Sequence, residues 1–99
     1  MNRIDLDTFA ARWLRSVCEG APLDPLLGGA LDPTSFAERA AAVRRKLGAP
    51  LEGTVDEIVR EGDRVAWRWT LRGPNGTVRG ANFQQLVDGR AVTHWTVAI

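Results

Sequence analysis

The sequence predicts an α+β domain in which two to three N-terminal helices cover one face of an antiparallel sheet of about four strands. Two observations predict this class. In the first half of the chain, apolar residues recur every three or four positions, which is the period of an amphipathic helix. In the second half, three turn signals separate runs rich in Val, Thr, Trp and Phe, which is typical of strands joined by hairpins.

Composition and charge limit the possible classes of function. The 99 residues allow one domain over 1–99, and 44% hydrophobic with 25% charged residues is an ordinary globular balance. A net charge of +1 gives no reason to expect a nucleic-acid partner. One Cys and one His provide no metal-ligand set, and no cofactor is expected. No apolar run suits a membrane span or a signal peptide, so we expect a soluble, cytoplasmic protein with no membrane partner.

The first helix is predicted over residues 5–19. Asp5 or Asp7 can cap its start, and Gly20 followed by Pro22 ends it. Its charged residues lie mostly on the side opposite an apolar stripe. The stripe consists of Leu6, Phe9, Ala10, Trp13, Leu14 and Val17.

The connector over residues 20–32 contains two prolines and three glycines, which exclude a long regular element. Its leucines are too apolar for a solvated linker, so we expect a short helical turn packed on the domain. A lid over a cavity is the functional alternative.

The second helix begins at Asp32, the N-cap, with Pro33 at the first helical position, and it ends before Gly48 and Pro50. Its last turn is basic, and these charges complement the helix dipole without an anionic partner. The buried stripe is Phe36, Ala40, Val43 and Leu47, and the basic residues are Arg44, Arg45 and Lys46.

The turn signals Glu61-Gly62-Asp63, Asn75-Gly76 and Asp88-Gly89 place strands at roughly 53–60, 64–73, 77–87 and 90–98, paired in sequence order. A two-residue loop at Asn75-Gly76 would pair Trp69 with Asn82. One at Asp88-Gly89 would pair Asn82 with Trp95. Side chains alternate along a strand, so one face is expected to meet the helices. That face carries Val65, Trp67, Trp69, Leu71, Val78, Asn82, Gln84, Leu86, Thr93, Trp95 and Val97.

Polar side chains interrupt this face opposite three tryptophans. A buried amide without a partner costs about 1–3 kcal/mol, so the amides need hydrogen bonds, ordered water or a ligand. Aromatic walls with a few convergent polar groups are typical of a small-molecule pocket. The alternative is that the amides bond to one another and to turn backbone inside a closed core. The expected binding residues for a small apolar molecule are Trp67, Trp69, Asn82, Gln84, Thr93 and Trp95.

Residues 54–70, with the turn Gly62-Asp63-Arg64-Val65, and residues 87–95 resemble the SnoaL-like polyketide cyclase branch of the NTF2-like superfamily. The resemblance extends over roughly 33–98. It implies a cone-shaped α+β fold, with a curved sheet around a pocket and helices closing the mouth. Homodimers through the outer sheet face are common in the family. Here that face is expected to carry Ala81, Phe83, Val87, Val92 and His94, with His94 at the interface or surface and not acting as a base.

In the family's cyclases an acid/base aspartate sits shortly after the Trp of the strand, and no carboxylate follows Trp95 in this sequence. Asp56 is the candidate substitute. If the turn Glu61-Gly62-Asp63 keeps the parity of the next strand, Asp56 would face Trp67, where burial would raise its pKa and suit proton transfer. The opposite parity would expose Asp56 and place Val55 and Val59 inside.

Two functions therefore remain open. The first is a cyclase, isomerase or hydrolase acting on an apolar, polyketide-like substrate. The alternative is a non-catalytic ligand-binding or accessory module of the same fold.

Overall fold

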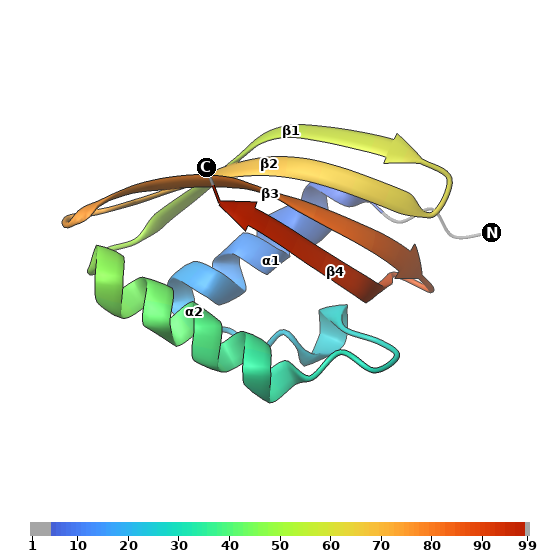
Figure 1. Cartoon of the computed structure of the whole chain (residues 1–99), viewed down its shortest axis with the longest axis horizontal. Helices are drawn as coiled ribbons and strands as arrows, with labels where there is room; N and C mark the ends of the chain where they lie inside the picture. Colours follow the sequence, from blue (N-terminus) through green and yellow to red (C-terminus); the bar gives the residue numbers. More distant parts are fainter. Residues whose placement is uncertain (1–4, 99) are drawn as a thin grey trace.

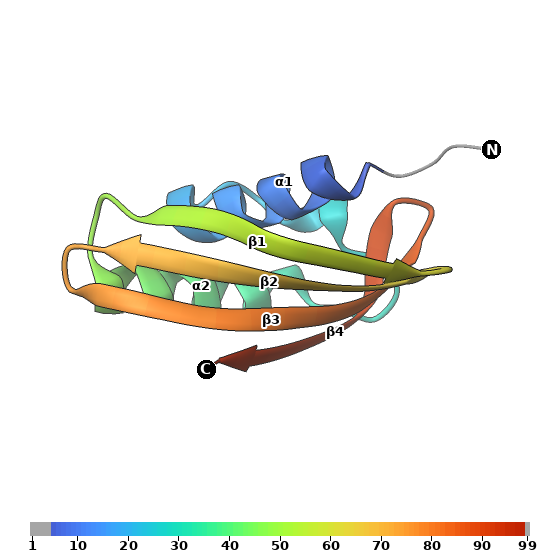
Figure 2. The same cartoon turned by 90° about the horizontal axis from the view of Figure 1, so that it is seen from above.

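A computed structural model describes residues 5–98. Its elements are α1 (Leu6–Glu19), the short 3₁₀ turn η1 (Asp24–Leu26), α2 (Pro33–Leu47), β1 (Glu52–Glu61), β2 (Arg64–Gly73), β3 (Gly76–Val87) and β4 (Arg90–Ala98). The strands form one antiparallel sheet in the order β1-β2-β3-β4, curved over the two helices (Figure 1). Seen from above, both helices lie behind the sheet (Figure 2). The predicted α+β class is confirmed.

Side chains cap both ends of α1, and the one at its C-terminal end comes from α2. Asp5 caps α1, its carboxylate accepting from the backbone of Asp7 at 3.1 Å. At the other end of α1, Arg44 of α2 donates to the backbone oxygen of Val17 at 2.9 Å and to that of Ser16 at 3.4 Å. The guanidinium therefore satisfies carbonyls in the last turn of α1, in addition to lying in the last turn of its own helix.

The connector packs on the domain, as predicted. Leu23, Leu26 and Leu27 are buried. The backbone N–H of Gly28 donates to the oxygen of Ala91 at 2.8 Å, which fixes the connector to the start of β4. The short helical turn and its leucines thus close one end of the sheet.

The β2–β3 hairpin turns one position earlier than expected. Gly73 pairs with Gly76, so the loop residues are Pro74 and Asn75, and Trp67 pairs with Asn82. The register differs from the predicted one by two residues. A shift of two preserves which face each side chain occupies, so the inward face of both strands is as predicted.

A β-bulge in β4 reverses the predicted face of most of that strand. Leu86 pairs with Ala91 but Gln85 pairs with Thr93, so Val92 is the extra residue. Beyond it, His94 pairs with Gln84 on the helix side. Val92 lies against two connector glycines, off the outer face. The expectation that Thr93, Trp95 and Val97 face the helices was therefore wrong, and all three side chains are exposed.

A second bulge lies in β1 between Val55 and Glu57, and its extra residue is Asp56. Val55 and Ile58 both pack against the core, while Val59 is exposed. Neither parity considered from the sequence is correct, because the bulge changes the parity within the strand.

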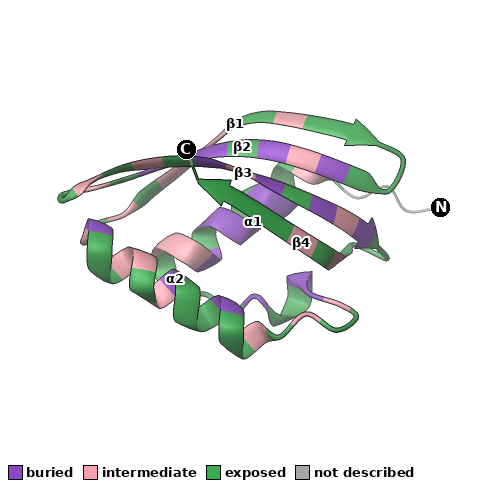
Figure 3. Cartoon of the chain, viewed as in Figure 1, coloured by how far each residue is buried: buried purple, intermediate pink, exposed green. Residues whose placement is uncertain are grey.

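The core fills the space between the sheet and the helices, and buried and exposed positions alternate along β2 and β3 (Figure 3). Asn82 and Gln84 are only 3% and 4% exposed on this inner face, as predicted. Trp69 lies across β3 at Gly80, where a Cβ atom would overlap the indole ring. Gly80 is thus needed for the close approach of Trp69, which forms part of the site below.

Candidate functional site

Two hollows lie on opposite faces of the sheet. A cavity of about 230 Å³ lies on the helix side, lined by side chains from α1, α2, β2, β3 and β4. A more open hollow of about 520 Å³ lies on the outer face. The first lies between the sheet and both helices and joins aromatic walls to a few convergent polar groups, and it is the candidate site. We call it the helix-side cavity.

Aromatic rings from both helices pack against the imidazole of His94 in this cavity. Trp13 of α1 stacks on it, with ring centroids 4.9 Å apart. Phe36 of α2 meets the same imidazole edge-on at 5.0 Å. Trp69 of β2 also lines the cavity. The amphipathic stripes of both helices therefore supply rings to the wall as well as to the core.

One chain of hydrogen bonds connects the polar groups of the wall. Trp67 Nε1 donates to Gln84 Oε1 at 2.9 Å, and Gln84 Nε2 lies 3.0 Å from His94 Nδ1. His94 Nε2 lies 2.6 Å from Thr96 Oγ1, which donates to Asn82 Oδ1 at 3.0 Å. Trp69 Nε1 donates to the same oxygen of Asn82 at 3.0 Å.

The two indoles fix the direction of every bond in this chain, because an indole N–H only donates. Trp67 requires the oxygen of Gln84, so the amide nitrogen of Gln84 donates to Nδ1 of His94. Neutral His94 consequently carries its proton on Nε2 and donates to Thr96. The hydroxyl proton of Thr96 then goes to Asn82.

Burial is the main reason that the pKa of His94 falls from 6.5 to about 4, and the nearby positive charge of Arg39 lowers it further. The imidazole is therefore neutral near pH 7. Arg39 itself lies at the exposed edge of the cavity, its guanidinium carbon 4.5 Å from the centre of the Phe36 ring. It is the one charged residue at neutral pH among the described residues that line the helix-side cavity.

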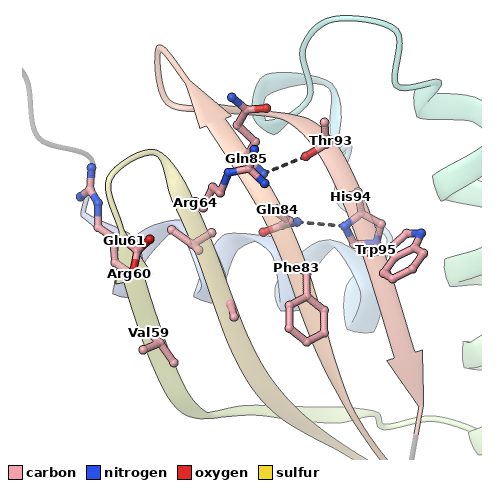
Figure 4. Close-up of a pocket in the computed structure, with 12 residues that line it drawn as sticks. Val59, Arg60, Glu61, Arg64, Phe83, Gln84, Gln85, Thr93, His94 and Trp95 are labelled. Carbon is pink, nitrogen blue, oxygen red and sulfur yellow. Dashed lines mark hydrogen bonds between the residues drawn. The ribbon is translucent and has the colours of Figure 1, made fainter.

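The outer hollow follows one row of side chains across the sheet. Val59, Ala66, Phe83 and Trp95 are successive partners from β1 to β4. Figure 4 shows Phe83 in the middle of this hollow, between Val59 and Trp95. Trp95 is 75% exposed there. We call these four residues the outer row; their exposed apolar surface suits contact with another protein surface.

Solved structures share this arrangement of helices and strands. TsrD from Streptomyces laurentii superposes with a TM-score of 0.77 and 19% identity, over 99% of this chain and 90% of that one. For IdmH, a proposed polyketide cyclase from Streptomyces antibioticus, the values are 0.71 and 19%, over 93% and 90%. For a proposed SnoaL-like polyketide cyclase from Jannaschia sp. CCS1 they are 0.60 and 17%, over 99% and 90%.

The chain has an NTF2-like fold, which it shares with proposed SnoaL-like polyketide cyclases. No family model and no curated protein sequence matches it. Within residues 5–98, no helix is long and apolar enough to cross a membrane.

The binding residues expected from the sequence divide into three groups within this NTF2-like fold. Trp69 and Asn82 line the helix-side cavity. Trp67 and Gln84 are buried beside it and hold His94 through the hydrogen-bond chain. Thr93 and Trp95 lie on the outer face, and Thr93 accepts a hydrogen bond from the backbone of Gln85.

Asp56 is exposed on the outer face, as in the second alternative, and does not lie beside Trp67. The bulge turns its carboxylate toward two hydroxyl groups. Thr70 donates to Oδ2 at 2.6 Å and Thr54 donates to Oδ1 at 3.3 Å. The placement of His94 at the interface or surface was wrong, because the bulge in β4 turns it toward Trp13.

Among the aromatic and polar residues that line the cavity, five were not assigned by sequence reasoning. Two of them lie in the predicted apolar stripes of the helices, and their role follows once both helices cover the same face. The polar residues of β4 depend on the bulge, which no local pattern indicates. The five are Trp13, Phe36, Arg39, His94 and Thr96.

Proposed function

We propose that this chain binds a small, apolar, ring-containing molecule in the helix-side cavity. The observation that carries the proposal is the combination of an open volume, aromatic walls and an oriented hydrogen-bond chain on one wall. Protein interiors are normally close-packed, and an unfilled volume among large apolar side chains lowers stability. A ligand that filled it would restore those contacts.

The amides by themselves do not require a ligand. Gln84 and Asn82 are bonded to the two indoles and, through His94 and Thr96, to each other. That agrees in part with the closed-core alternative, in which the amides satisfy one another. The cavity beside Asn82 is what distinguishes a pocket from that closed core.

The binding test uses the tryptophans as internal reporters. With the indoles labelled with ¹⁵N, 2-naphthol is titrated into the protein and the indole N–H signals are followed by NMR. Binding in the helix-side cavity is expected to shift the Trp69 signal and to leave the exposed Trp95 signal in place. A shift of Trp95 alone would move the site to the outer hollow. No shift of either signal would contradict the proposal.

A cyclase, isomerase or hydrolase activity on a polyketide-like substrate is the second candidate. It is supported by the position of His94 on the cavity wall and by the fold that the chain shares with proposed polyketide cyclases. The described residues that line the cavity include no carboxylate, so acid/base chemistry there would depend on His94.

The catalytic candidate is tested by the exchange of the α-protons of 2-tetralone into deuterated water. His94→Gln retains an oxygen that can accept from Gln84 but removes the imidazole. An accelerated exchange that this variant loses, with 2-tetralone binding retained, supports an enzyme. Binding without any acceleration in the natural chain supports the non-catalytic module.

We also propose that a second copy of this chain covers the outer row. Charged residues of both signs flank the row on β1 and β2, with Glu61 opposite Arg64 on one side and Glu57 opposite Arg68 on the other. A two-fold interface brings the same surface of each copy together, so a surface with both signs can complement itself. Of the five residues expected at this interface, Ala81, Phe83 and Val87 lie on this outer face.

A further inference from the structure

The hydrogen-bond chain uses the side-chain acceptors along this wall of the helix-side cavity. Gln84 Oε1 accepts from Trp67, and Asn82 Oδ1 accepts from both Trp69 and Thr96. Nδ1 of His94 accepts from Gln84, and Thr96 accepts from His94. A ligand that approached this wall as a hydrogen-bond donor would compete with bonds already made.

Asn82 presents a donor to the same space. Its Nδ2 group takes part in none of the side-chain hydrogen bonds among residues 5–98, although the side chain lines the cavity. No fully buried side-chain nitrogen or oxygen of these residues lacks a partner, so Nδ2 keeps some accessible surface, and the open volume that Asn82 lines lies next to it. Its two N–H groups therefore remain available to a bound molecule.

Arg39 adds a positive charge at the edge of the cavity. The ion pairs within the described chain, Arg15 with Glu19 and Arg68 with Glu57, do not include it. Its charge acts on the interior, because it helps to lower the pKa of His94. The guanidinium lies over Phe36, an aromatic wall of the cavity, and no acidic residue among the lining residues neutralises it.

We propose that the molecule bound in the helix-side cavity is an organic acid, an apolar ring system whose carboxylate accepts hydrogen bonds from Asn82 Nδ2 and the Arg39 guanidinium. A carboxylate has only acceptors when ionised, and it matches amide and guanidinium donors. An ammonium group would face donors and a cation. This inference rests on the proposed binding function and names the chemical class of its ligand.

The test compares three probes of one shape that differ in charge: 2-naphthoate, 2-naphthamide and the ammonium form of 2-(aminomethyl)naphthalene. Affinities are measured at neutral pH and low salt from the Trp69 indole signal. We expect 2-naphthoate to bind about tenfold more tightly than the amide, or about 1.4 kcal/mol, and the ammonium probe to bind most weakly. Added salt should reduce this preference, because Arg39 is exposed.

Variants at Arg39 separate charge from shape, and circular dichroism checks that each variant folds, because the guanidinium lies over Phe36. Arg39→Ala should lower 2-naphthoate affinity to about the level of the amide, and the uncharged amide should lose much less affinity than 2-naphthoate does. Arg39→Glu should make the ammonium probe bind more tightly than 2-naphthoate. Arg45→Ala removes an exposed arginine of the same helix that does not line the cavity, and it should change no affinity beyond a small salt-dependent effect.

Equal affinity for 2-naphthoate and 2-naphthamide, or 2-naphthoate binding that Arg39→Ala does not weaken, would overturn the carboxylate assignment and leave the binding function standing. If none of the three probes shifts the Trp69 signal, the proposed binding function fails, and this inference fails with it.

Discussion

Gln84 Nε2 lies 3.0 Å from Nδ1 of His94, and this contact admits only the neutral imidazole. The amide of Gln84 cannot turn over, because its oxygen already accepts from the indole of Trp67. A proton on Nδ1 would therefore point at an amide N–H. Burial and the charge of Arg39 act in the same direction, and the pKa of His94 falls to about 4.

The first prediction is a His94 titration far below the ordinary range. The chain has one His, so its ring protons give one NMR titration curve. We expect the midpoint near 4 in the folded protein, against 6.5 for an unperturbed imidazole. A midpoint near 6.5 would contradict the burial of the imidazole between the sheet and the helices.

The same shift predicts how stability depends on pH. Between about pH 4 and pH 6.5 the unfolded chain binds a proton at His94 that the folded chain does not, so stability rises with pH there. The contribution is complete above pH 6.5 and is lost as the pH falls toward 4. After allowance for partial exposure it is on the order of 2 kcal/mol. Urea unfolding at pH 7 and pH 4.5 should show a smaller loss for His94→Gln than for the natural chain.

The sequence predicts β2 and β3 well because no bulge interrupts either strand, so side chains alternate between the two faces along both. Trp67, Trp69, Asn82 and Gln84 all occupy the expected face, even though the hairpin register differs by two. Pro74 explains that difference, because the loop consists of Pro74 and Asn75 and not of the expected Asn-Gly pair. The bounds of the two helices also agree with the sequence, because caps and apolar stripes are local features of the chain.

The two edge strands were harder to predict because a bulge is set by tertiary contacts. In β1 the bulge lets both Val55 and Ile58 reach the core. In β4 it lets Ala91 face the connector and His94 face Trp13. Because His94 and Trp95 are adjacent in β4, one of these two rings faces the helices whichever way the strand alternates. The alternation of residues alone therefore does not decide which one is inside.

The second prediction concerns the space under Trp69. Gly80→Ala would place a methyl group within the indole ring, so Trp69 would have to move. We expect a loss of about 1–3 kcal/mol in the free energy of unfolding and weaker probe binding. Trp69→Leu should recover only part of the cost of Gly80→Ala, because the backbone oxygen of Val97 also lies 2.6 Å from the added methyl group. Ala81→Val, which adds bulk on the outer face, is the control; equal effects of both substitutions would contradict the close approach.

The third prediction concerns the contact between the helices. Arg44→Ala removes the hydrogen bonds to the carbonyls of Val17 and Ser16 at the end of α1. Urea unfolding should show a loss of about 1–2 kcal/mol. Arg45→Ala, one position further along α2, removes an exposed charge and should cost less than about 0.5 kcal/mol. Equal losses would mean that the capping bonds contribute nothing.

The fourth prediction concerns Asp56, the acid/base candidate from the sequence. Its carboxylate faces Thr70 and Thr54 on the outer side of the sheet, so Asp56→Asn should leave both probe binding and any tetralone exchange unchanged. Stability should fall by about 1 kcal/mol or less, because one amide oxygen can still accept from Thr70. Loss of exchange in this variant would return Asp56 to the candidate site.

The last prediction concerns the outer row, where Trp95 is the most exposed large hydrophobic side chain among the described residues. If a second copy covers the row, the natural chain sediments as a dimer, and Trp95→Lys sediments as a monomer because an ammonium group would have to be buried in the apolar contact. Probe binding should persist in this variant, since the helix-side cavity lies on the other face of the sheet. Glu38→Arg changes an exposed charge on α2, away from the row, and should leave the dimer intact. A natural chain that sediments as a monomer at all accessible concentrations would contradict the proposal, because this apolar row would then stay in contact with water.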